Sequence, residues 1–198
     1  MVLRALVGSL SAAVVMFAWG FIFWAALPST QAMLRPIPNE EAVVSVLEEN
    51  LKESGSGTYR FPLPSEEDQR RAPVRAMENA MRRYRIGPVG MLSYRAEGLD
   101  PMSPMVFATG FLHYFVSAVL AALLLAAAAP ALRSYAARAG FVFLAGVFAA
   151  VALEGADPIW FFKPWDYSLY VAVYDMVCWL LAGLVLGIFV KKRPANAL

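Results

Sequence analysis

The sequence predicts an all-α membrane protein: a four-transmembrane-helix bundle with a small extracytoplasmic α+β insert between helices 1 and 2. Four long apolar stretches predict this fold, because each approaches or reaches the roughly 20 residues that a bilayer-spanning helix needs. They cover residues 5–26, 105–129, 139–156 and 168–190. The composition agrees, since 60% of the 198 residues are hydrophobic, more than an ordinary soluble domain contains.

The charges that flank these stretches predict their orientation. Basic residues without accompanying acids lie at alternate ends: Arg4, Arg133, Arg138, Lys191, Lys192 and Arg193. The opposite ends are mainly acidic and contain one lysine: Glu154, Asp157, Asp166 and Lys163. By the positive-inside rule, both termini are predicted to be cytoplasmic, with residues 27–104 and 157–167 outside. The short cytoplasmic loops and the small size favour the bacterial inner membrane.

The first stretch also has features of a signal peptide. A basic residue, Arg4, precedes it, and Thr30-Gln31-Ala32 is a passable cleavage site. However, the apolar run Ala5–Ala26 is longer than the 7–15 residues of an ordinary signal sequence, and it ends in aromatic residues typical of a membrane interface. We therefore expect an uncleaved first span. Cleavage would leave the predicted orientation of the other three spans unchanged.

Residues 27–104 contain ordinary folding signals. Asn39 is a good N-cap, and the acids that follow it favour a helix start. The predicted order is helix, strand, helix and strand, with the second helix starting at Ser65 or Pro73 and ending at Arg85. An apolar stripe is expected on this second helix: Val74, Met77, Met81 and Tyr84. The insert has only a marginal core of its own, so we expect it to lean on the membrane surface or on a partner.

The charge of the insert argues against nucleic acid as a partner. It contains ten basic and eleven acidic residues, so no basic groove is predicted. The arginines near residues 70–85 alternate with acids at helical spacing. This pattern favours a solvated, salt-bridged helix face over a phosphate-binding site.

The single histidine and single cysteine restrict the chemistry. One cysteine, Cys178, excludes a disulfide within the chain and the chemistry of a thiol pair. One histidine, His113, excludes bis-histidine haem ligation and a multi-histidine metal site within one chain. The sequence also contains none of the standard hydrolase or nucleotide-binding motifs. We therefore predict no catalytic residue, no metal site and no cofactor.

Ionisable residues inside the apolar stretches indicate a polar site. His113 and Asp175 each lie about nine residues from the predicted outer end of their span, so they are expected at similar depth. Glu154, Ser117 and Tyr174 are predicted nearby. One hypothesis is a site for a proton or a polar ligand. The favoured alternative is an interhelical hydrogen bond that fixes helix register.

The connector at residues 157–167 is rich in aromatic residues. Two prolines prevent a regular helix there. Its large side chains and one lysine favour an aromatic belt at the membrane interface. The alternative is a docking surface, or the rim of a lipid or quinone site, made of Trp160, Phe161, Phe162, Lys163 and Trp165.

Together these patterns predict a non-catalytic integral membrane protein of the cell envelope, either an accessory or scaffold subunit or a homo-oligomer. The expected partners are the lipid bilayer and a membrane protein or further copies of the chain. The alternative is a small transporter, channel or lipid/quinone-binding protein that uses an intramembrane pair of His113 and Asp175.

Overall fold

The computed structural model describes residues 2–191, so Lys192 and Arg193, which entered the orientation prediction, lie outside the described residues. The described chain is mostly helical and contains one two-stranded sheet. It divides into two compact units. Within the described range, unit 1 comprises residues 2–35, 100–156 and 165–191, and unit 2 comprises residues 36–99 and 157–164.

Unit 1 contains four helices that are long and apolar enough to cross a bilayer, as predicted. They are α1 (Val2–Phe21), α6 (Pro104–Ala128), α7 (Tyr135–Glu154) and α9 (Trp165–Phe189). A five-residue π-helix, η1 (Ile22–Ala26), extends α1, and the short helix α2 (Pro28–Met33) follows it. The short helix α8 (Ala156–Trp160) follows α7 and contains Pro158, so the prediction that prolines prevent a helix in the connector is wrong for its first residues; proline is tolerated there because it lies in the first helical turn.

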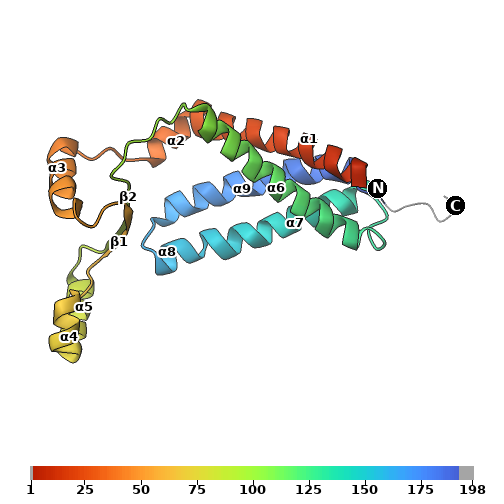
Figure 1. Ribbon diagram of the computed structural model, residues 1–198. Helices are drawn as coiled ribbons and strands as arrows, with labels where there is room; N and C mark the ends of the chain where they lie inside the picture. The colour runs from red at the N-terminus through yellow and green to blue at the C-terminus, as the bar shows by residue number, and fades with distance from the viewer. Residues whose placement is uncertain (1, 192–198) are drawn as a thin grey trace. The chain divides into compact units, whose positions relative to one another are not determined.

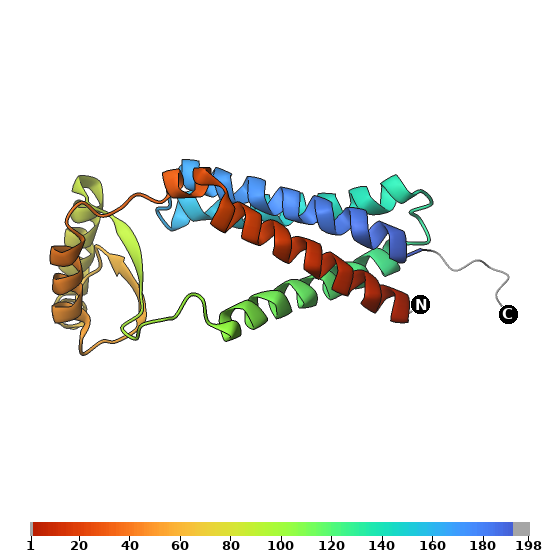
Figure 2. The ribbon, with the colours of Figure 1, turned by 90° about the horizontal axis from the view of Figure 1, so that it is seen from above.

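The long helices of unit 1 pack side by side. Helix α9 contacts both α7 and α1, and α1 also contacts α6 (Figures 1 and 2). Small side chains dominate the core, together with a few larger ones: Ala12, Met16, Ala118, Ala122, Leu125, Val142, Cys178, Ala182 and Leu186. Small residues allow helix backbones to approach closely in a membrane, where lipid provides no hydrophobic driving force between helices.

The closest approach is between α7 and α9. A Cβ atom added to Gly146 would lie 2.1 Å from the Cβ of Trp179, and one added to Gly183 would lie 2.6 Å from the carbonyl oxygen of Ala139. The ring of Tyr135 lies 3.2 Å from the Cβ position of Gly187. The sequence motif Gly183-x-x-x-Gly187 therefore marks a helix contact, as its spacing indicates.

Arg138, near the start of α7, is buried rather than exposed. Its Nε donates a hydrogen bond to the carbonyl oxygen of Gly187 at 3.0 Å. Its Nη1 donates to the carbonyl oxygens of Leu132 at 3.5 Å and Arg133 at 3.4 Å. This guanidinium thus joins the α6–α7 turn to the last turns of α9, where helical carbonyls lack partners of their own.

Unit 2 contains the predicted order of elements. Helix α3 (Glu40–Leu51) begins at Asn39, whose side chain accepts a hydrogen bond from the Ala42 amide. The remaining elements are β1 (Gly57–Phe61), α4 (Glu66–Arg71), α5 (Pro73–Ile86) and β2 (Gly90–Tyr94). The two strands pair antiparallel, with Gly57 opposite Tyr94 and Phe61 opposite Gly90. The second predicted helix is observed as two helices, one for each of its predicted starts. Ser65 caps α4, and α5 begins at Pro73.

The helices of unit 2 have almost no buried core. Helices α3 and α4 bury no residue, and α5 buries only Ala76 and Ala80. Three residues of the predicted apolar stripe of α5, Val74, Met77 and Met81, are exposed, whereas the fourth, Tyr84, packs on Phe162. The residues that α5 buries are the alanines of another face, which leaves these larger side chains outside.

Candidate functional site

Two tyrosines connect three of the long helices. The hydroxyl groups of Tyr114 on α6 and Tyr174 on α9 share a hydrogen bond. Gly20 of α1 leaves room for them, because a Cβ atom there would lie 2.9 Å from the Tyr114 hydroxyl oxygen and 3.3 Å from that of Tyr174. The indole Nε1 of Trp19 donates to the carbonyl oxygen of Tyr174 at 3.2 Å. A polar contact therefore holds α1, α6 and α9 together within an apolar unit.

The π-helix η1 extends this contact into a larger aromatic group. Phe23 of η1 lies with its ring centroid 4.5 Å from that of Tyr170 and 4.9 Å from that of Tyr174. The hydroxyl group of Thr30 donates to the carbonyl oxygen of Phe23 at 2.6 Å and also bonds the Tyr170 hydroxyl at 2.8 Å. We call Tyr114, Tyr170 and Tyr174 the tyrosine cluster. Tyr174 is the member that was predicted as a site residue, and the spacing of Tyr170 and Tyr174 places both on one helix face.

The predicted partners His113 and Asp175 are not joined. His113 is exposed, and its ring lies beside that of Tyr114 with centroids 5.2 Å apart. Among residues 2–191, no hydrogen bond or ion pair connects His113 to Asp175. Successive residues point about 100° apart around a helix, so a helix that directs Tyr114 toward α9 directs His113 to its periphery. Ser117 donates its hydroxyl proton to the carbonyl oxygen of His113 at 2.9 Å, within its own helix.

Asp175 lies instead within the electrostatic range of another carboxyl group. Its charge interacts with that of Glu154 on α7, and both side chains are half-buried. The described residues contain no group of three or more histidine, cysteine, aspartate or glutamate side chains that would hold a metal ion. Carboxyl groups in a bundle of long apolar helices are suited to hydrogen bonding between helices.

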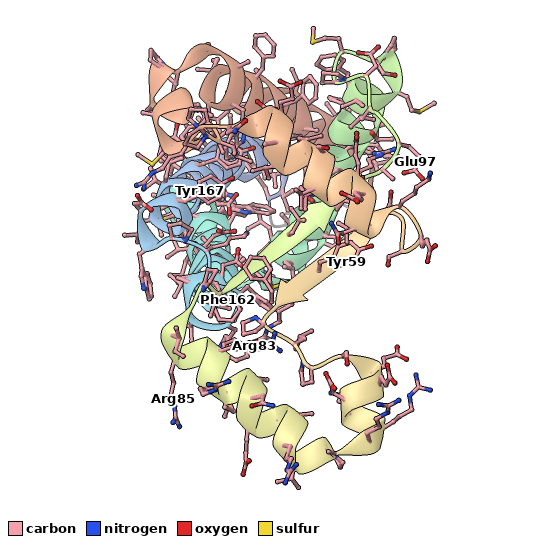
Figure 3. The ribbon with its side chains drawn as sticks, turned by 90° about the vertical axis from the view of Figure 1, so that its left-hand side faces the viewer. Tyr59, Arg83, Arg85, Glu97, Phe162 and Tyr167 are labelled. Atoms are coloured by element: carbon pink, nitrogen blue, oxygen red, sulfur yellow. The ribbon has the colours of Figure 1, made fainter. Side chains whose placement is uncertain are left out.

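The aromatic connector contributes one residue to the interior of unit 2. The ring of Phe162 packs against that of Tyr84 on α5, with centroids 6.0 Å apart. The guanidinium carbon of Arg60 on β1 lies 5.0 Å from the Phe162 centroid and 5.7 Å from the Tyr84 centroid. Figure 3 shows Phe162 beside the sheet, with Arg83 and Arg85 in the last turn of α5 below it. Phe162 thus joins the connector to β1 through one cation–π contact with Arg60, and to α5 through one ring contact with Tyr84.

The backbone at Phe162 has an unusual conformation. Its φ angle is +64°, in the left-handed region that residues other than glycine rarely adopt. Lys163 forms an ion pair with Asp157 across the same turn. Trp160, Phe161 and Trp165 are exposed. Of the five connector residues selected from the sequence, one is therefore packed, one is ion-paired and three are available for contacts.

An apolar cavity opens between α6 and α7 in unit 1. Its volume is about 250 Å³, and its larger lining residues are Leu120, Leu124, Phe141 and Trp179. Ser117 also lines it, but its hydroxyl group donates to its own helix. Because no lining side chain is charged, the cavity suits a hydrocarbon chain better than a polar ligand.

No protein-family model, curated protein or solved structure matched this chain.

Proposed function

We propose that this chain is a non-catalytic integral membrane protein that acts as an accessory or scaffold subunit. In this proposal its four long helices span the bacterial inner membrane with both termini in the cytoplasm. Unit 2 then lies on the extracytoplasmic side, where it binds a protein partner or a second copy of the chain.

The observation that carries the proposal is the uncovered apolar face of α3. None of its twelve residues is buried, and Val43 and Val44, which share a face with the half-buried Leu47 and Leu51, are exposed. An amphipathic helix with an open apolar face is a common way to engage a groove on another protein. A protein that needs no partner gains little from leaving these valines in water.

The charge of α3 limits the chemistry of its partner. The helix carries four glutamates, at positions 40, 41, 48 and 49, and no basic residue. A matching surface has an apolar groove with arginine or lysine at its rim, because complementary charges favour the correct encounter and oppose others.

Site-specific photo-cross-linking in native membranes tests the proposal. A benzoylphenylalanine at Val43 is expected to cross-link to a protein that mass spectrometry identifies. The matched control is Ser45, which is exposed on the other side of the same helix, about 160° from Val43, and is expected to give no comparable product. A foreign subunit supports the accessory role and a product of two copies supports the homo-oligomer. Equal or absent cross-linking at the two positions contradicts the proposal.

The cavity between α6 and α7 favours a second function, the binding of a lipid chain. Ala145 lines this cavity, and the substitution Ala145→Phe is expected to fill it. Native mass spectrometry of the detergent-purified chain then gives the test. A lipid adduct that is present in the original protein and absent from Ala145→Phe supports this function, and an adduct unaffected by the substitution opposes it.

A further inference from the structure

Helix α5 carries an apolar stripe that no other described part of unit 2 covers. Val74, Met77 and Met81 recur at helical spacing and are 70%, 54% and 53% exposed. With Pro73, Glu78, Arg82 and Arg85 they line one shallow depression of about 750 Å³, so the charged residues at this face are two arginines and one acid. The opposite side of the helix holds the buried alanines, so this stripe is its free face.

The same helix is strongly basic. It contains four arginines, at positions 75, 82, 83 and 85, and one acid, Glu78, for a net charge of +3. Arg83 is turned away from the stripe, since its Nη2 donates to the carbonyl oxygen of Leu63 at 3.0 Å. Arg82 and Arg85 flank the stripe, and within residues 2–191 neither forms an ion pair.

The arginines of the neighbouring helix α4 differ from Arg82 and Arg85 because they form ion pairs. There Arg70 pairs with Glu66 at 2.9 Å, and Arg71 pairs with Glu67 at 2.5 Å. The prediction of a salt-bridged face is therefore confirmed for α4. It is wrong for α5, whose single glutamate forms no ion pair with any of its four arginines in the described chain.

Few residues of the sequence separate the contact that α5 makes with the connector from a candidate span. Tyr84 of α5 packs on Phe162, and Trp165, the first residue of α9, follows three residues later in the chain.

We propose that the exposed face of α5 binds an anionic phospholipid surface. Val74, Met77 and Met81 enter the boundary between headgroups and acyl chains, while Arg82 and Arg85 bind lipid phosphates. An apolar stripe bordered by arginines is typical of helices that lie in a membrane interface, and guanidinium groups pair well with phosphate. The acidic helix α3 is unsuited to this surface, because an anionic bilayer repels its four glutamates. The lipid site on α5 is thus separate from the partner site proposed for α3.

Fluorescence of the full chain in vesicles tests the lipid site. In the variant Met77→Cys, the new thiol carries an environment-sensitive nitrobenzoxadiazole label, and nitroxide lipids in the bilayer act as quenchers. The native Cys178 is buried, and the parent protein treated with the same reagent measures any background labelling. The comparison position is Asn79→Cys, which is exposed on the opposite part of α5.

In phosphatidylcholine vesicles that contain phosphatidylglycerol, the label at position 77 is expected to emit at shorter wavelength. Nitroxide lipids are expected to quench it about twofold more than the label at position 79. Pure phosphatidylcholine vesicles are expected to reduce this difference, as is the double substitution Arg82→Gln/Arg85→Gln. The matched control Arg70→Gln/Arg71→Gln removes the same charge from α4 and is expected to leave the quenching unchanged.

Three results overturn the proposal. Equal quenching at positions 77 and 79 means that the stripe does not enter lipid. If the quenching is the same with and without phosphatidylglycerol, and the same with and without Arg82 and Arg85, then no anionic headgroup is recognised. A shift to shorter wavelength without nitroxide quenching means that protein covers the stripe. Each result leaves the cross-linking test on α3 unaffected.

Discussion

Trp179 packs directly onto Gly146 where α9 crosses α7, with no space for even a methyl group between them. The contact is made by the Cβ and ring atoms of the tryptophan, so a side chain at position 146 meets atoms that are fixed by the α9 backbone.

The substitution Gly146→Ala is therefore expected to destabilise unit 1. An added Cβ would lie 2.1 Å from the Trp179 Cβ, and overpacking of this kind costs roughly 1–3 kcal/mol. The free energy of unfolding in detergent gives the measurement. The matched control is Gly140→Ala on the same helix, where no atom lies within 4 Å of the new Cβ. That control is expected to be neutral or slightly stabilising, because alanine favours helix more than glycine. Equal effects of the two substitutions would contradict the close crossing.

The tyrosine cluster predicts a measurable coupling between α6 and α9. Tyr114→Phe removes the hydroxyl bond to Tyr174 and is expected to cost about 1 kcal/mol of stability. Tyr174→Phe should cost a similar amount, and the double variant should cost less than the two together, because both delete the same bond. The control is Tyr167→Phe, whose hydroxyl forms no recorded hydrogen bond in the described chain. Strict additivity of the two substitutions would show that the hydroxyl groups act independently.

The packing of Phe162 predicts that Phe162 and its neighbour Phe161 contribute differently to the local stability of unit 2. Phe162→Ala removes the ring that contacts Tyr84 and Arg60 and is expected to speed amide hydrogen exchange at β1 and the end of α5. Phe161→Ala changes an exposed ring of the same size and is expected to leave exchange there unchanged. Phe162→Gly should be about 1 kcal/mol less destabilising than Phe162→Ala, because glycine adopts positive φ without strain. Similar exchange in the Phe161 and Phe162 variants would contradict the contact.

Glu97 predicts a local response to pH in unit 2. The hydroxyl group of Ser56 donates to its Oε2 at 2.6 Å, and this hydrogen bond is the main cause that lowers the pKa of Glu97 below 4.5. Since the folded-state pKa is depressed, the contact stabilises the fold above the usual carboxyl pKa and is lost as pH falls through the lower value. Ser56→Ala is expected to raise the pKa of Glu97 toward 4.5, as measured by carboxyl NMR titration. An unchanged titration would show that Ser56 does not hold the carboxylate, and Ser93→Ala on β2 serves as the control.

The elements that follow from local sequence were predictable. Apolar length alone locates the four long helices, and the Asn39 cap and the prolines locate helix starts in unit 2. The direction in which each helix side chain points in the folded chain was not predictable in the same way. The depth of His113 follows from counting residues, whereas its direction depends on the rotation of α6, which Tyr114 determines by bonding Tyr174. A rotation of one residue, about 100°, is enough to move a side chain from a helix interface to the lipid-facing side.

The stripe on α5 shows a related limit. Periodicity predicts that Val74, Met77 and Met81 share a face, but it does not say whether that face or the alanine face packs inside the unit. Arg60 and Phe162 are more than a hundred residues apart, and no local pattern indicates that they meet. Cation–π contacts between distant segments become visible only in the folded chain.

The buried guanidinium of Arg138 has a consequence for biogenesis. Its strongest partner, the carbonyl oxygen of Gly187, is 49 residues later in the chain and is synthesised after α7 has been made. Until the last helix is inserted, Arg138 has only the carbonyl groups of its own turn, so its charge remains at the aqueous boundary. In the proposed orientation, the charge of this arginine first keeps the α6–α7 turn on the cytoplasmic side. After α9 has been inserted, the arginine donates a hydrogen bond to the Gly187 carbonyl oxygen of that helix. A nascent chain arrested before Gly187 would therefore expose a charge that the finished protein buries.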